Sequence, residues 1–313
     1  MCFFTHIRII CFNTIILLLL LFNCAYSQQQ YNILNENYIS LSSTRSEINL
    51  ENQLWILEDK EQKMNLEDIR KSSSFNKSAA EKINYGLTNA AYWVTFNLLV
   101  EDIEENGWMI ICKNTNMNYL DLYVYDENNY LLKSSHTGNL LPFDSRETEN
   151  RYFTFNLPVE KGKKYKVYMR FKSEDAMAPL LSIETTNDFW ENQYKLQMIE
   201  GFYFGTMLIM AFYNLFLFFA ILDSSYLFYV LFIVASIFLQ LEMGGWFFQF
   251  YWRDLPQVTS KIGFIFLGLS IFFAIKFMES FINRKYTNRT IRNLFYLIKI
   301  ISIVEVMTGI FLP

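Results

Sequence analysis

Cysteine and histidine supply many of the nucleophiles and metal ligands in proteins, and this sequence holds few of either. The chain has 4 cysteines and 2 histidines in 313 residues. Only Cys112 and His136 lie beyond the first 27 residues, which we expect to be removed. One cysteine and one histidine exclude the usual zinc-binding sets, and a catalytic pair would require Cys112 to meet His136. His136 lies among small polar residues, which predicts an exposed loop.

Carboxylates and glycines show no catalytic spacing either. The sequence contains no glycine loop of the kind that holds phosphates, and no pair of acidic residues stands out, although a glycosidase-type pair is compatible with the sequence. A net charge of -4 gives no basic surface for nucleic acid. We therefore expect no enzyme activity, no metal, no cofactor and no nucleic-acid partner.

The first 27 residues have the organisation of a secretory signal peptide. Arg8 precedes an apolar run that ends at Phe22, and Ala25 and Ser27 provide the small residues of a cleavage site. The run is short for a membrane span, so an uncleaved anchor is the less favoured alternative. The sequence predicts a signal peptide over residues 1–27 and export of the following residues.

Residues 28–194 have the composition of a water-soluble domain, in which short aromatic and β-branched segments alternate with turns. Leu120, Leu122 and Val124 alternate with polar and aromatic residues, as in a strand with one buried face. We expect an all-β sandwich or jelly roll, together with a short helix that begins at Asn65. The expected strands are 92–100, 108–113, 119–125, 130–133, 151–159, 165–172 and 180–185.

Residues 195–313 contain four apolar stretches of about the 20 residues that a membrane helix needs. They are 199–222, 226–243, 262–281 and 294–312. Export of the preceding domain places the loop after the third stretch in the cytoplasm. That loop is rich in basic residues, whereas the outer loop 244–261 has only Arg253 and Lys261, in agreement with the positive-inside rule. The inner basic residues are Arg284, Lys285, Arg289 and Arg292.

Two polar residues within the apolar stretches require partners. We expect Asn214 to form a packing hydrogen bond within the bundle rather than a ligand site. Glu305 is neutral, paired with a group outside the four stretches, or functional. A transporter or channel fragment would need several such residues near the membrane centre, and Glu305 alone supports it weakly.

Several short motifs occur in one order along the chain, and together they resemble a known family. The motifs include residues 57–59, 84–86, 91–96, 120–123, 200–205, 213–217, 225–229 and 244–252. The sequence resembles the bacterial seven-transmembrane receptors with diverse intracellular signalling modules, of the kind with the second type of extracellular domain.

This resemblance implies a jelly-roll sensor similar to carbohydrate-binding modules, seven helices, and a cytoplasmic effector such as a histidine kinase or a cyclase. The chain has four of the seven helices and no effector. We therefore expect a fragment truncated within the membrane region, or an orphan sensor that signals through a partner.

The expected function is signal reception at the bacterial plasma membrane. The domain outside the cytoplasm would bind a small molecule or glycan, and the helices would relay the event to a cytoplasmic partner or through a homodimer. Stacking aromatics and arginines are the candidate ligand contacts, although such residues also serve in cores. The candidates are Trp93, Trp108, Arg146, Arg151 and Arg170. The alternative is a membrane-anchored module that holds envelope carbohydrate without signalling.

Overall fold

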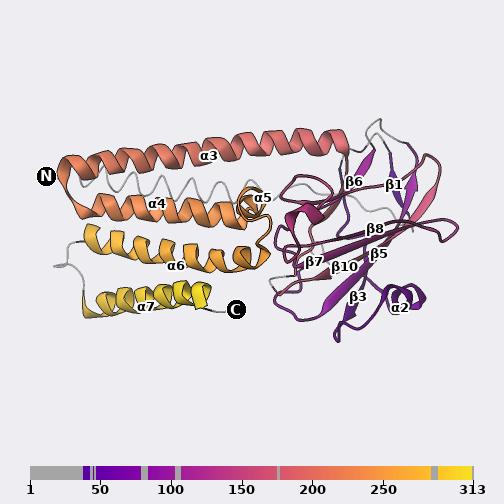
Figure 1. Cartoon of the computed structure of the whole chain (residues 1–313), viewed down its shortest axis with the longest axis horizontal. Coiled ribbons are helices and arrows are strands. Elements are labelled where there is room, and N and C mark those ends of the chain that lie inside the picture. Colours follow the sequence, from indigo (N-terminus) through magenta and orange to yellow (C-terminus); the bar gives the residue numbers. More distant parts are fainter. Residues whose placement is uncertain are drawn as a thin grey trace. The chain divides into compact units, whose positions relative to one another are not determined.

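The computed structural model describes residues 38–42, 45, 47–78, 84–102, 107–174, 177–282 and 288–311. All of them belong to one compact unit, and the predicted signal peptide lies outside them. Strands fill this unit as far as Thr185, and long helices follow from Thr186 (Figure 1). This order agrees with the predicted all-β domain followed by membrane helices.

Two β-sheets form the first part of the unit. Within the described residues, one sheet has seven strands in the order β4-β3-β5-β10-β7-β8, with β1 parallel to β5, and the other has the order β2-β11-β6-β9. The strands are β1 (Ile39–Leu41), β2 (Glu47–Asn49), β3 (Trp55–Asp59), β4 (Asn76–Lys77), β5 (Ala91–Val100), β6 (Trp108–Cys112), β7 (Tyr119–Asp126), β8 (Leu131–Thr137), β9 (Phe153–Asn156), β10 (Lys164–Lys172) and β11 (Leu181–Thr185).

The main core lies between the inner faces of these sheets. Leu120, Leu122 and Val124 are fully buried, so the alternation seen in the sequence correctly predicts which face of β7 is inside. They belong to the same apolar cluster as Ile110 of β6 and Ile183 of β11, on the second sheet. Because burying these two apolar faces requires two sheets packed together, the predicted sandwich is confirmed.

A short helix, α2 (Leu66–Lys71), covers part of the outer face of the seven-stranded sheet. Asn65 caps it as predicted: the Asn65 side chain accepts from the backbone N–H of Asp68, and the Asp68 side chain accepts from that of Asn65. Ile69 is fully buried against Leu57 and Trp93. The helix thereby covers one side of this face.

The last strand continues directly into the first long helix, α3 (Thr186–Ile221), without a linker. Thr185 caps the helix, and Phe189 is fully buried against Met109 and Ile111 on the outer face of the four-stranded sheet. This packing explains why α3 begins before the apolar stretch predicted at residue 199. The domain boundary suggested at residue 194 lies inside this helix.

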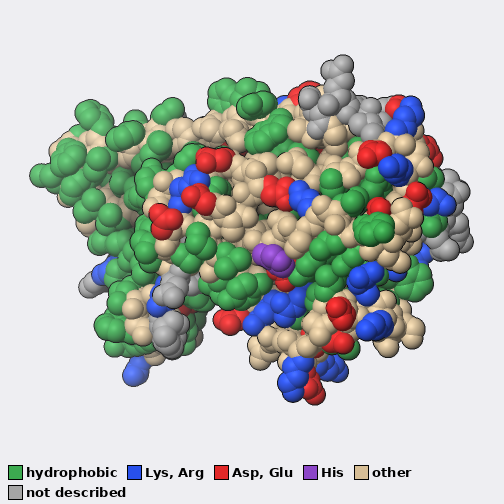
Figure 2. All heavy atoms as spheres, turned by 45° about the vertical axis from the view of Figure 1, so that its right-hand side comes forward, with side chains coloured by type: hydrophobic (Ala, Val, Ile, Leu, Met, Phe, Trp, Pro, Cys, Tyr) green, Lys and Arg blue, Asp and Glu red, His purple; other side chains and the backbone are tan. Residues whose placement is uncertain are grey.

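Four helices are long and apolar enough to cross a membrane: α3, α4 (Ser224–Met243), α6 (Pro256–Phe281) and α7 (Arg289–Phe311). A five-residue helix, α5 (Trp246–Phe250), connects α4 to α6 and was not predicted. Neighbours pack as α3 with α4, α4 with α6, and α6 with α7. Hydrophobic side chains cover most of the helical part in Figure 2, whereas charged side chains are spread over the sandwich.

Candidate ligand-binding face and its connection to the membrane helices

Four neighbouring strands each contribute one residue to a row across the outer face of the seven-stranded sheet. Arg170 of β10 lies opposite both Trp93 of β5 and Asp121 of β7, and Asp121 lies opposite His136 of β8. We call these four residues the cross-strand row. His136 Nδ1 is 2.9 Å from Asp121 Oδ1, and Arg170 Nη1 is 3.6 Å from Asp121 Oδ2. The row thus aligns a guanidinium, a carboxylate and an imidazole.

Aromatic rings accompany the charged members of the row. Tyr123 stacks on Trp93 with 6.3 Å between ring centroids and meets the His136 ring edge-on at 5.6 Å. The Arg170 guanidinium lies 5.9 Å from the Trp93 ring. Burial, with a further contribution from Asp121, raises the pKa of Tyr123 to about 12, so its hydroxyl is protonated at neutral pH. The face therefore combines stacking surfaces with hydrogen-bond donors and acceptors.

Two donors of the row lack a protein acceptor. Trp93 Nε1 and Arg170 Nε are buried, and neither has a hydrogen-bond partner among the residues that the structure describes. A buried donor left unsatisfied costs about 1–3 kcal/mol. Because both atoms are buried, this unmet bonding capacity lies inside the packed face and is not itself a contact open to a surface ligand.

The second aromatic candidate, Trp108, lies elsewhere. Its ring is 1% exposed in the core between the sheets, and its Nε1 donates to the carbonyl of Asp102 at 3.3 Å. A ligand on the surface does not reach this ring. Of the five residues predicted from the sequence, the structure brings Trp93 and Arg170 together and places Trp108 apart from them.

Arg146 lies in the loop between β8 and β9, where it is enclosed by aromatic rings. Its guanidinium carbon is 4.0 Å from the centre of the Phe153 ring and 5.3 Å from that of Phe248 in α5. The same group donates to Asn139 Oδ1 at 2.9 Å and to two backbone carbonyls of the loop. Burial lowers the pKa of Arg146 to about 9, so it remains charged at neutral pH.

Arg151, the fifth candidate, connects the sandwich to the helices. It is 4% exposed, and its Nη2 donates to Glu200 Oε1 of α3 at 2.7 Å. Its guanidinium also lies 4.5 Å from the Trp246 ring of α5. We call Arg151, Glu200 and Trp246 the junction. Arg146 thus contacts α5, and Arg151 contacts both α3 and α5, and this position favours a structural role for both.

A second set of contacts holds the same loop against the segment between α5 and α6. Arg253 Nη2 is 2.6 Å from Asp144 Oδ1 and 3.0 Å from Glu149 Oε1, and these carboxylates raise the pKa of Arg253. The Arg253 carbonyl accepts from the N–H of Phe143 at 2.9 Å, and the Phe143 ring meets Phe248 edge-on. Sequence reasoning missed this pairing, since it counted Arg253 only as a loop charge.

The family comparison divides the chain at the same place as the fold. The description "7TMR-DISM extracellular 2" matches residues 51–185, and "7TM diverse intracellular signalling" matches residues 196–313. The chain belongs to the 7TMR-DISM family. It is a multi-pass membrane signalling receptor with an extracellular N-terminal domain, and the two matched regions contain no catalytic domain. No curated protein matches the chain.

In this 7TMR-DISM receptor the two predicted intramembrane polar residues behave differently. Asn214 Nδ2 donates to the carbonyl of Met210 at 2.8 Å, so it bonds to its own helix rather than to a neighbouring one. Glu305 Oε2 is buried and has no partner within the described part of the chain.

One expectation about the receptor's extracellular domain was wrong. His136 lies in strand β8 rather than in a loop, and Ser134 and Ser135 precede it in the same strand. β8 is the last strand of its sheet, where polar side chains face water and discourage pairing with other chains. The polar composition of β8 therefore led to the prediction of a loop, and the contact between His136 and Asp121 was not predicted.

Proposed function

We propose that this receptor binds a small oxygen-rich molecule, such as a glycan or polyol, at the cross-strand row. The observation that carries this proposal is the alignment of Trp93, Arg170, Asp121 and His136 on neighbouring strands. Aromatic faces pack against the C–H groups of a sugar ring, while a guanidinium and a carboxylate bond its hydroxyls. Of the five sequence candidates, the proposal keeps Arg170 as a ligand contact, whereas Trp93, which is 2% exposed, supports the Tyr123 ring that stacks on it.

The second half of the proposal is a relay across the membrane. A ligand that favours one arrangement of the sandwich would shift the helices from one packing arrangement to another. An effector or partner in the cytoplasm would respond to this change in helix packing. Two features support this. Strand β11 continues into α3, and Arg151 holds α3 and α5 to the same loop. Cleavage of a signal peptide after residue 27 and location in a bacterial plasma membrane belong to the same proposal.

Binding by the full chain in lipid nanodiscs tests the ligand site. Calorimetry against a set of neutral and acidic glycans should find a ligand, and Arg170→Met should weaken its binding about tenfold, the effect of one lost charge-assisted hydrogen bond. Lys164→Met is the matched control, since Lys164 is an exposed residue at the other end of β10. Equal affinities for both variants would contradict the placement of the site.

The relay can be separated from simple anchoring by hydrogen exchange. A relay predicts that the bound ligand changes amide exchange in α4 to α6 as well as in the sandwich. Changes confined to the sandwich would instead support the alternative of an anchored carbohydrate-binding module.

A further inference from the structure

Basic side chains form a line along β10 on the outer face of the seven-stranded sheet. The alternate residues of β10 that start at Tyr165 belong to the main core, so the residues between them project outward. Lys166, Arg170 and Lys172 are among these outward residues. Lys166 and Lys172 are six positions apart, which corresponds to about 20 Å along the strand. Lys164 lies outside this line, since the pairing of β10 with β7 starts only at Tyr165.

Aromatic rings hold these basic groups in place at the surface. Lys172 Nζ is 5.5 Å from the centre of the Tyr119 ring, which lies opposite it on β7. Arg70 of α2 places its guanidinium carbon 4.2 Å from the centre of the Tyr125 ring, and Tyr125 is the β7 partner of Lys166. Such contacts are favourable because the face of an aromatic ring attracts a cation. The basic stripe, as we call this set, consists of Arg70, Lys166, Arg170 and Lys172.

Positive charge exceeds negative charge along the basic stripe. Both β7 and β10 are described in full, and their outward residues include a single carboxylate, Asp121, which Arg170 shares with His136. Arg70, Lys166 and Lys172 form no salt bridge within the described part of the chain. Arg70 and Lys166 are exposed, and Lys172 is partly exposed. This face is therefore basic, although the whole chain has a net charge of -4.

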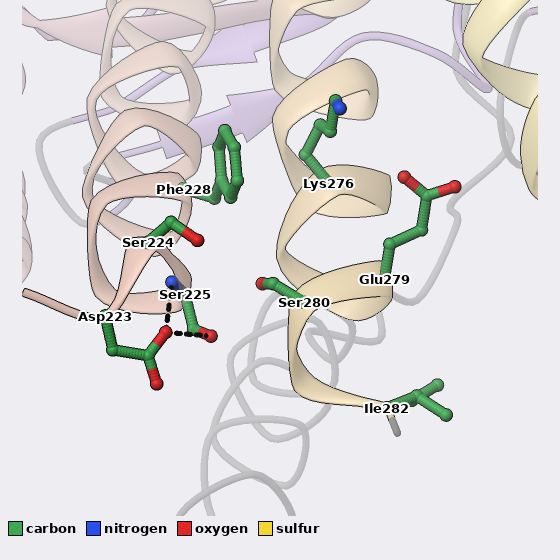
Figure 3. Close-up of a pocket in the computed structure, with 8 residues that line it drawn as sticks. All are labelled: Asp223, Ser224, Ser225, Phe228, Lys276, Glu279, Ser280 and Ile282. Atoms are coloured by element: carbon green, nitrogen blue, oxygen red, sulfur yellow. Dashed lines mark hydrogen bonds between the residues drawn. The ribbon is translucent and has the colours of Figure 1, made fainter. Parts of the chain in front are cut away.

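The pocket between α4 and α6 offers no comparable set of charges. Its two carboxylates are already bonded: Asp223 accepts from the N–H and the hydroxyl of Ser225 (Figure 3), and Glu279 accepts from Lys299 of α7 at 2.6 Å. Lys276 is the one basic residue in its lining. A single cation gives no pattern for a particular ligand to match, whereas the basic stripe repeats its charges along a strand.

We propose that the basic stripe binds an acidic polysaccharide, a polymer whose sugar rings carry anionic groups. This ligand class rests on the proposed glycan site, since Arg170 belongs to both. A polysaccharide lying along β10 would place its anionic groups against the ammonium and guanidinium groups. Tyr119 and Tyr123 are partly exposed on the neighbouring strand, where sugar rings can pack on them. A polyphosphate has no ring for these side chains, so the aromatic residues favour a glycan.

Calorimetry with the full chain in nanodiscs of phosphatidylcholine tests this ligand class. Polygalacturonate or dextran sulfate should bind, and its uncharged counterpart, methyl-esterified polygalacturonate or dextran, should bind at least tenfold more weakly. The double change Lys166→Met and Lys172→Met should weaken binding of the acidic polymer about tenfold, as expected for two exposed charge pairs. The matched control is Lys161→Met with Lys163→Met, which removes the same charge before β10, where both lysines already pair with carboxylates.

Failure of the acidic ligand is distinguishable from failure of the glycan site. Equal binding of the charged polymers and their uncharged counterparts would overturn the acidic ligand and leave the glycan site in place, whereas no binding of any glycan would overturn both. Equal weakening by the two double variants would also overturn the acidic ligand. So would binding of inorganic polyphosphate as tight as that of the acidic polysaccharide, because charge alone would then govern binding. Circular dichroism and melting temperature verify that both variants are folded.

Discussion

Arg151 illustrates how one buried charge can fix the position of several elements. Its guanidinium contacts α3 through Glu200 and α5 through Trp246, although the residue itself belongs to the sandwich. Charges in such a place are stable only when paired, because removal from water is costly. The requirement for a partner thereby sets where the helices meet the β domain.

Replacing Arg151 by methionine should destabilise the receptor by about 2 kcal/mol. Loss of one partner from a fully buried pair costs about 3–5 kcal/mol, and the side chain of Glu200 is 26% exposed, so water compensates in part. Thermal unfolding of the full chain in nanodiscs measures the effect. Lys195→Met is the control, since its pair with Glu191 is exposed to water and contributes little to stability. Similar losses in both variants would refute the assigned role of Arg151.

Cys112 should remain unreactive as long as the sandwich is folded. Its thiol is fully buried, and burial raises the pKa from 9.0 to about 12. The unfolded chain therefore loses this proton first, so the titration of Cys112 does not alter stability below pH 9 and decreases it between pH 9 and 12. Thiol labelling at pH 8, in a variant with Cys2, Cys11 and Cys24 changed to serine, should follow global unfolding. Labelling at the rate of a free thiol would contradict this burial.

Local sequence predicted some residues of the site and could not predict others. The alternation in β7 shows that Asp121 lies opposite the buried face of Leu120 and Leu122, and the position of Asn65 indicates a cap. The helix residues that Arg146 and Arg151 contact, however, lie 49 or more positions further along the chain. Pairing over such distances depends on tertiary packing, which no local pattern encodes.

Among the elements, α3 differs most from the sequence-based prediction. A hydropathy pattern identifies only the apolar part of a helix. It therefore gave no signal for the polar turns of α3 that begin at Thr186. Those turns are stabilised by Phe189 against Met109 and Ile111 instead. The short helix α5 was missed for another reason, namely that five residues are too few for a periodic signal.

Inserting one alanine after Lys195 tests the continuity of α3. Each residue rotates a helix by about 100°, so the insertion would turn Glu200 away from Arg151. We expect a lower melting temperature and loss of any ligand-induced change in the helices. The same insertion beside Asn128, in the exposed turn between β7 and β8, should have little effect. If the insertion after Lys195 left the melting temperature unchanged, the contact between Arg151 and Glu200 would not depend on the rotation of α3 about its axis.

For the molecule as a whole, sequence composition correctly predicted the division into a sandwich and apolar helices. Orientation in the membrane rests on the number of basic residues near the helix ends. Arg253 of the outer segment pairs with Asp144 and Glu149. The positive-inside rule counts lysines and arginines whatever their partners, so this pairing leaves the argument for the orientation unchanged.

Labelling of single cysteines in intact cells tests this orientation. With the other cysteines except Cys112 removed, Asn128→Cys should react with a membrane-impermeant reagent, whereas Arg289→Cys should react only after permeabilisation. The reason is that the sandwich and the start of α7 lie on opposite sides of the bilayer. Reaction of Arg289→Cys in intact cells would refute the topology.

The absence of a linker between β11 and α3 also limits how this sensor can be recombined. A chimera that joined a different β domain at residue 194 would cut within α3, and it would discard the turns that Phe189 anchors. Domain exchange should succeed only when the helix is cut and rejoined with its residue count preserved, and when the loop that contacts α5 is transplanted as well. In this receptor, the unit of modular exchange therefore includes the first turns of the membrane helix.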